Sequence, residues 1–139
     1  MLTDQERIDI VRYRMENAQN TLAEVDVHIQ NRFYNTAANR MYYACYYAVS
    51  ALLLANGITT KSHDGVIQMF GLHFIRTGVF PAHYGRDYSQ LFGERETGDY
   101  EDFFNHDEES IAEIYPKAKE IFAAVKEKVD QWLADNTAE

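Results

Sequence analysis

Apolar residues recur every three or four positions along the first thirty residues. This stripe consists of Ile8, Val11, Met15, Ala18, Leu22, Val25 and Ile29. The spacing follows the 3.6-residue period of an α-helix and gives it one apolar face. Thr3 and Glu6 precede the stripe at the spacing of a capping box, which marks a helix start. We therefore predict a first helix that starts at Thr3 and covers the core; a coiled-coil seam is the less frequent alternative for about three heptads.

Residues 41–55, MYYACYYAVSALLLA, are apolar or aromatic on nearly every face. The segment is shorter than the ~20 residues that a membrane span needs, so it is expected to be the central buried helix of a bundle. Asn56 and Gly57 then provide a C-terminal stop. Small residues recur along one face of this segment, and that face can serve either the core or a dimer interface: Ala44, Ala48, Ala51 and Ala55.

Two more helices are expected before residue 100. Ser62 or Asp64 can cap a third helix, which closes at Thr77 and Gly78. Pro81 suits the first turn of a fourth helix, where a missing amide costs nothing. One stripe of this fourth helix carries an arginine at the end of an apolar face: Tyr84, Tyr88, Leu91 and Arg95.

Apolar residues at helical spacing between residues 111 and 132 indicate a last helix. Asn105 or Asp107 can cap this helix. Pro116 interrupts this pattern, so we expect a kink or a fresh helix start there. Only two prolines and seven glycines occur in 139 residues, which disfavours an all-β domain. The prediction is an all-α fold, a single domain over residues 1–139 built as an up-and-down bundle of four long helices plus a shorter one.

The chain carries a formal net charge of −9, which argues against a general nucleic-acid coat protein. The charge is unevenly distributed, because residues 32–95 contain six basic and three acidic side chains. Any polyanion is therefore expected to bind in this middle segment. The polar start of the chain and the lone Cys45 fit a cytoplasmic protein with no membrane span.

The sequence contains no pattern typical of a metal or cofactor site. None of its five histidines is three or four residues from another, and the glycines match no phosphate-binding loop. Cys45 lies in an apolar segment and is expected to pack as a small hydrophobic residue. We expect neither a metal nor a cofactor.

Polar residues remain at three expected helix ends: Asn39-Arg40, His63-Asp64 and the run from Arg95 to Tyr100. One interpretation is a structural network in which Arg95 pairs with Asp99 and Arg40 caps a carbonyl. The other is a phosphate or RNA-backbone site, because the planar guanidinium group of arginine suits phosphate beside aromatic faces.

These residues resemble the HEPN family of small α-helical domains. The resemblance rests on RFYNTAANRMYYACYYAVSALLLANGI (32–58), KSHDGVIQMFGLHFIRTG (61–78) and ERETGDYEDF (94–103). It implies an up-and-down bundle that commonly dimerises and is often encoded beside a minimal nucleotidyltransferase, in toxin–antitoxin or defence modules. In ribonuclease members an arginine, four to six further residues and a histidine form a metal-independent RNA-cleaving site. Here Arg95 and Glu96 match the start of that motif, but Tyr100 follows after four residues and the next histidine is His106.

The preferred hypothesis is a homodimeric, non-catalytic binding or regulatory partner of a nucleotidyltransferase that contacts nucleotide or RNA. Its candidate binding residues are Asn39, Arg40, Tyr43, His63, Arg95, Glu96, Asp99 and Tyr100. The alternative is a metal-independent endoribonuclease that uses Arg95 with Tyr100, His63 or His106; His63 can take part if the third helix starts beside the end of the fourth. A third reading is a purely structural dimer.

Overall fold

The computed structural model describes residues 1–100 and 105–137, with the backbone alone for residues 96–100. Over these residues the chain forms five α-helices and one π-helical turn, without a strand. The elements are α1 (Asp4–Gln30), α2 (Tyr34–Ala55), α3 (His63–Phe70), the turn Gly71–Ile75, α4 (Ala82–Tyr100) and α5 (Glu108–Thr137). The predicted all-α bundle of four long helices and a shorter one is confirmed.

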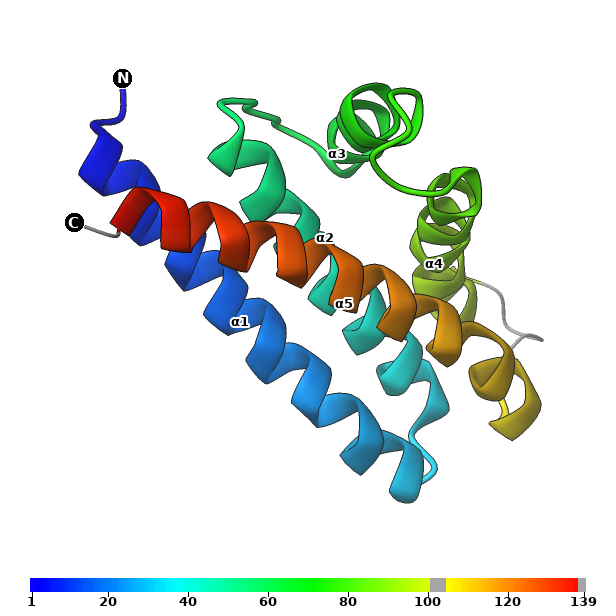
Figure 1. The fold of residues 1–139 in the computed structure, drawn as a ribbon. Coiled ribbons are helices and arrows are strands. Elements are labelled where there is room, and N and C mark those ends of the chain that lie inside the picture. The colour runs from blue at the N-terminus through cyan, green and yellow to red at the C-terminus, as the bar shows by residue number, and fades with distance from the viewer. Residues whose placement is uncertain (101–104, 138–139) are drawn as a thin grey trace.

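The helix α2 is the centre of the bundle. It packs against α1, α3, α4 and α5, and more than half of its residues are buried. Figure 1 shows α1 and α2 antiparallel, with α5 running along them and both chain ends at the same end of the bundle. In the part of the chain that the structure describes, no helix combines the length and hydropathy needed to cross a bilayer.

The first helix begins as predicted. The Glu6 amide donates to Thr3 Oγ1 over 3.1 Å, and the Thr3 amide donates to Glu6 Oε1 over 3.0 Å, which completes the capping box. Most of the predicted apolar stripe is buried, and Leu22 and Ile29 are partly buried against the core. The stripe therefore covers the core of its own domain.

The central helix begins earlier than predicted, at Tyr34 rather than at Met41. Its N-cap residue, Phe33, makes no side-chain capping bond, so the usual sequence signal for a helix start is missing. Asn39 and Arg40 consequently lie inside the helix, not at its head. The predicted small-residue face is buried within the single chain and serves the core.

The short third helix is capped by Ser62, whose hydroxyl accepts a 2.9 Å bond from the Gly65 amide. It continues as the π-helical turn to Ile75 and does not reach Thr77 as α-helix. Gly78 then adopts a φ of 80°, a left-handed conformation that suits glycine. Pro81 precedes α4 instead of lying in its first turn, and its carbonyl accepts from the Tyr84 amide.

The last helix runs through Pro116 without interruption, so the alternative of a fresh helix start is wrong. Buried isoleucines on both sides of the proline, Ile114 and Ile121, keep the two halves on one core. Asp107 caps this helix, because its Oδ1 accepts a 2.8 Å bond from the Ser110 amide.

Candidate functional site

Tyr42 and six other side chains from three helices form one group of contacting residues, and we call them the Tyr42 cluster. Its members are Arg40, Tyr42, Tyr43 and Tyr46 from α2, His63 from α3, and Phe92 and Arg95 from α4. The helix positions are fixed by burial, since Tyr42 is fully buried and stacks on the equally buried Tyr88 of α4. The cluster thus joins the three segments in which the sequence predicted polar candidates.

His63, the first residue of α3, is held from two sides. Its Nδ1 lies 2.6 Å from the Tyr42 hydroxyl, and its ring stacks on Tyr46 with a centroid distance of 4.3 Å. The Ser62 cap sets where α3 begins and therefore where His63 sits. The start of α3 does lie beside the end of α4, because the His63 ring also stacks on Phe92.

Arg95 lies across aromatic rings near the end of α4. Its guanidinium carbon is 4.3 Å from the centre of the Phe92 ring and 5.3 Å from that of Tyr42. Stacking of this kind is favourable and holds the planar guanidinium in place.

Arg40 of α2 lies over the ring of Tyr43, with its guanidinium carbon 5.2 Å from the ring centre. Its Nε and Nη2 both donate to the side-chain oxygen of Asn39, and not to a helix carbonyl as the structural interpretation expected. Tyr43 in turn meets His63 edge to face, with ring centres 5.7 Å apart. Asn39 therefore orients Arg40 toward the cluster.

The Tyr42 phenol keeps its proton at neutral pH. Burial raises the pKa of Tyr42 well above its ordinary value, and the nearby charge of Arg95 only partly opposes this. The guanidinium of Arg95 has no hydrogen-bond acceptor, so the Tyr42 hydroxyl cannot donate to it. Nδ1 of His63 is within reach of this hydroxyl and can accept its hydrogen bond. In that arrangement Nε2 carries the proton of the neutral His63 ring and acts as a donor.

The cluster is accessible at its rim. Tyr42 is buried, whereas Arg40, Tyr43, Tyr46, His63, Phe92 and Arg95 are each half-buried. A phosphate oxygen accepts hydrogen bonds and favours cations, and a nucleobase stacks on aromatic faces. The rim offers two guanidinium groups, one imidazole and three aromatic rings for such a ligand.

His106 has a structural role instead. It is buried; Nε2 lies 2.8 Å from the Glu94 carbonyl and Nδ1 lies 3.0 Å from Ser110 Oγ. Its amide donates to the side chain of Asn35 at the start of α2. With both ring nitrogens engaged, His106 connects three helices and is not placed to transfer protons to a substrate.

Three sequence candidates cannot be placed. The side chains of Glu96, Asp99 and Tyr100, and hence the expected pairing of Arg95 with Asp99, lie outside the described residues. In the described ranges, no group of three or more histidine, cysteine or acidic side chains is arranged to hold a metal ion. Cys45 is buried, which raises the pKa of its thiol to about 12 and makes it a poor nucleophile.

Tyr42, Tyr46 and Phe92 are the members of the cluster that the sequence did not single out. Tyr42 and Tyr46 are four residues apart, so a shared helix face was readable from spacing. Their partner His63 comes from another helix, and spacing says nothing about which helices meet.

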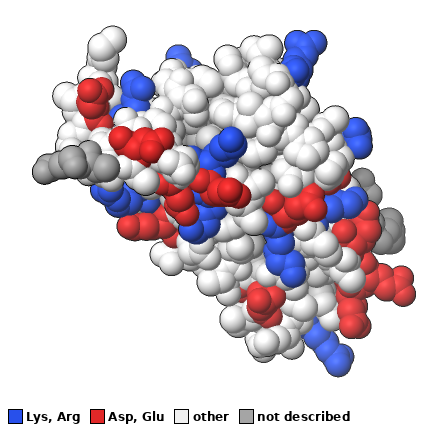
Figure 2. Space-filling view, in the orientation of Figure 1, with Lys and Arg blue, Asp and Glu red and all other residues white. Residues whose placement is uncertain are grey.

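Charges of both signs are interspersed on the face that Figure 2 shows, where α5 crosses the molecule. This face carries no large surface of a single sign.

The sequence comparison agrees with this architecture. The model of the HEPN domain matches residues 11–128, which include every member of the Tyr42 cluster. The chain belongs to the HEPN family.

Two relatives illustrate the range of names within this family. A UPF0332 protein of Thermotoga maritima is 33% identical over 125 residues, which cover 90% of this chain and 95% of the relative. A Methanocaldococcus jannaschii protein, provisionally named toxin MJ0605, is 35% identical over 101 residues, which cover 73% of this chain and 75% of the relative.

Proposed function

We propose that this HEPN protein is the RNA-binding, toxin-like component of a two-protein module and that RNA binds at the Tyr42 cluster. The observation that carries the proposal is that Arg40, His63 and Arg95, from three separate helices, converge on two adjacent tyrosines: His63 and Arg95 contact the buried Tyr42, and Arg40 lies over Tyr43. The provisional name of the archaeal relative, toxin MJ0605, supports the class of function.

Binding rests on two kinds of contact. Arg40 and Arg95 supply the positive charge for phosphate, and the half-buried rings of Tyr43, Tyr46 and Phe92 supply stacking surfaces for bases. His63, which contacts Tyr43 and Phe92, the rings that the two arginines lie over, adds a polar group to the same cluster. The groups are held by Asn39, Phe92 and Tyr42, so little side-chain ordering is needed when RNA binds.

The test is the affinity for a fluorescein-labelled single-stranded RNA, measured by anisotropy in excess chelator. Arg95→Met keeps a long unbranched side chain and removes its charge, and we expect at least tenfold weaker binding. Arg86→Met is the matched control, because Arg86 is an exposed arginine on the same helix. Equal losses in both variants, or no loss in Arg95→Met, would exclude the cluster as the binding site.

Metal-independent RNA cleavage is the second candidate function. It is favoured by one observation: His63 lies against Tyr42 and Phe92, the same two rings that Arg95 contacts. In such a reaction the 2′-oxygen attacks the adjacent phosphorus, the bond to the 5′-oxygen breaks, and protons move from the first oxygen to the second. When the Tyr42 hydroxyl donates to Nδ1, a His63 ring with a single proton carries it on Nε2. Such a ring donates a hydrogen bond to a phosphate oxygen but does not accept the proton of the 2′-hydroxyl.

Cleavage and binding are separated with two substrates in chelator. A catalytic site cuts RNA but not the same sequence with 2′-deoxyribose, and His63→Ala abolishes the cutting. A pure binding site leaves the RNA intact while retaining it. We expect binding without cleavage by the purified chain.

We infer in addition that the chain forms a homodimer and that its module partner is a minimal nucleotidyltransferase. The resemblance of residues 32–58, 61–78 and 94–103 to the HEPN pattern supports both inferences. Sedimentation equilibrium tests the dimer, and co-purification with a nucleotidyltransferase encoded beside this gene tests the partner. A monomer at all concentrations, or no co-purification, would contradict the respective inference.

A further inference from the structure

A pocket of about 420 Å³ opens between α1, α2 and residues 58–60. A volume of this size is typical of sites for small molecules. The pocket is lined by Leu2, Ile10, Tyr13, Arg14, Asn17, Tyr46, Tyr47, Ser50, Leu54, Ile58, Thr59 and Thr60. Of these residues only Tyr46 also belongs to the Tyr42 cluster.

Arg14 is the one charged side chain in this lining. It is half-buried, and Nη1 donates a long 3.3 Å bond to the Ser50 carbonyl. Among the described residues no carboxylate lies within ion-pair distance of Arg14. Within the described part of the chain, its remaining donors and its positive charge therefore face the pocket without an acidic partner.

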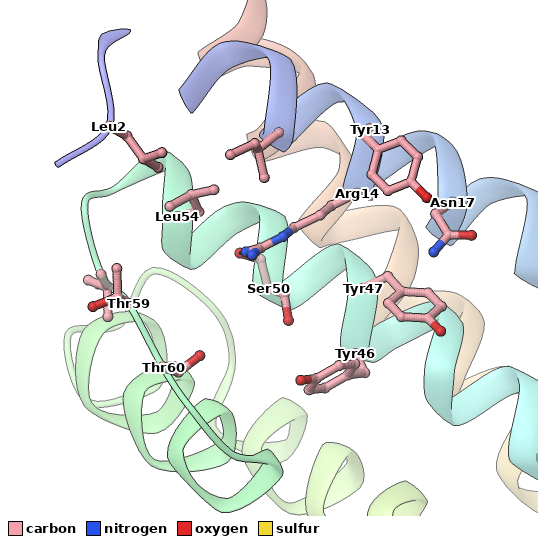
Figure 3. A pocket seen from close by; sticks show the side chains of 12 residues that line it. Leu2, Tyr13, Arg14, Asn17, Tyr46, Tyr47, Ser50, Leu54, Thr59 and Thr60 are labelled. Atoms are coloured by element: carbon pink, nitrogen blue, oxygen red, sulfur yellow. The ribbon is translucent and has the colours of Figure 1, made fainter. Parts of the chain in front are cut away.

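The rest of the lining is aromatic, hydroxylic or aliphatic. Figure 3 shows Arg14 reaching from α1 toward Ser50 on α2, with Tyr47 and Thr59 on either side of it. Tyr13 is 68% exposed, an unusual position for a large ring in a monomer, and it stands at the rim of the pocket. The hydroxyls of Thr59 and Thr60 add polar groups on the connecting segment.

We propose that this pocket binds a small planar aromatic anion. Its acidic group binds the guanidinium of Arg14, and its ring packs among Tyr13, Tyr46 and Tyr47. The lone positive charge selects an anion, because a neutral ligand leaves the half-buried guanidinium without a counter-charge. The volume suits one or two fused rings, and the site shares only the ring of Tyr46 with the proposed RNA site.

Isothermal titration calorimetry on the full chain tests the proposal with two probes, indole-3-acetate and phenyl phosphate. We expect saturable binding of one molecule per chain for at least one probe. The neutral indole-3-acetamide and the non-aromatic cyclohexylacetate separate the contributions of charge and ring. Each is expected to bind at least tenfold more weakly than indole-3-acetate if that anion is the better probe.

Arg14→Met removes the charge and is expected to weaken binding tenfold or more. Arg12→Met is the control, because Arg12 is exposed on the same helix and does not line the pocket. Should Arg14→Met fail to fold, Thr59→Trp places an indole at the exposed edge of the pocket without touching the core, and it also should block binding. Unchanged affinity in the folded variants, or no binding of either anion at millimolar concentration, overturns the proposal.

Discussion

The hydroxyl of Tyr42 lies 2.6 Å from Nδ1 of His63 and joins two helices across 21 residues of sequence. The phenol is buried and the imidazole is half-buried, so the bond connects the core to the rim of the site. It fixes the orientation of His63 and decides which ring nitrogen faces a ligand as a donor. This one contact links the stability of the fold to its proposed function.

Tyr42→Phe keeps the ring and removes this bond. We expect the free energy of unfolding to fall by about 1 kcal/mol, because a buried hydrogen bond is lost and Nδ1 of His63 loses its partner hydroxyl. RNA affinity should fall several-fold, since His63 is no longer oriented. Urea denaturation and anisotropy measure the two effects. Tyr43→Phe, a half-exposed ring in the same cluster, should change stability far less; equal effects of the two variants would refute this role of Tyr42.

His106→Ala should destabilise the protein without weakening RNA binding by the folded fraction. The buried imidazole bonds to the Glu94 carbonyl and Ser110, and its removal leaves these groups unsatisfied, at about 1–3 kcal/mol. Thermal and urea unfolding measure the loss. His83→Ala is the control, because His83 is exposed and pairs with Glu120 on the surface. Loss of RNA binding at full stability in His106→Ala would show a direct role for His106.

Stability should decrease at alkaline pH. Burial raises the pKa of the Cys45 thiol to about 12, while the same thiol in the unfolded chain ionises near ~8.5. As the pH rises, the thiol therefore ionises in the unfolded chain before it ionises in the folded protein. The stability that the protonated, buried thiol contributes is complete below about pH 8 and is lost as the pH rises toward 12. The expected slope for this group is about −1.4 kcal/mol per pH unit in that window.

Urea unfolding at neutral and alkaline pH measures this slope. Cys45→Ala lacks the thiol, so its free energy of unfolding should fall less steeply with rising pH than that of the parent protein. This holds whatever the absolute stability of the variant. Part of the slope should remain in this variant, because burial also raises the pKa of Tyr88. An identical pH dependence in the variant and the parent protein would contradict the assignment to Cys45.

Pro116→Ala should stabilise the protein by about 1–3 kcal/mol. The proline lies inside α5 on its exposed side, where it has no amide to donate to the preceding turn. Alanine restores that donor, although part of the gain is offset by a more flexible unfolded chain. Differential scanning calorimetry measures the change. Glu127→Ala, at an exposed position on the same helix, should leave stability nearly unchanged; a destabilised Pro116→Ala would show that the fold depends on the proline.

The helices could be predicted largely from spacing, because each one buries a continuous apolar stripe. The errors have local causes. The start of α2 at Tyr34 has no capping side chain to mark it, and α5 continues through Pro116 because buried residues on both sides share one core. Packing, which a single sequence does not display, decided both cases.

Half of the site could be predicted in the same way. Arg40, His63 and Arg95 stand out as polar groups next to aromatic segments, whereas the contacts among them depend on how α2, α3 and α4 meet. Tyr42 was read as part of an apolar helix, and its role follows only from its distance to His63. The pocket at Arg14 had no signal, because Arg14 lies among ordinary polar residues on the surface of α1.

The most direct test of the RNA site is photocrosslinking with a single-stranded RNA that contains 4-thiouridine, followed by mass spectrometry of the crosslinked peptides. We predict crosslinks at the half-buried rings of the Tyr42 cluster, Tyr43, Tyr46 and Phe92, and their loss in Arg95→Met but not in Arg86→Met. Crosslinks confined to residues outside α2, α3 and α4, and unaffected by Arg95→Met, would contradict it.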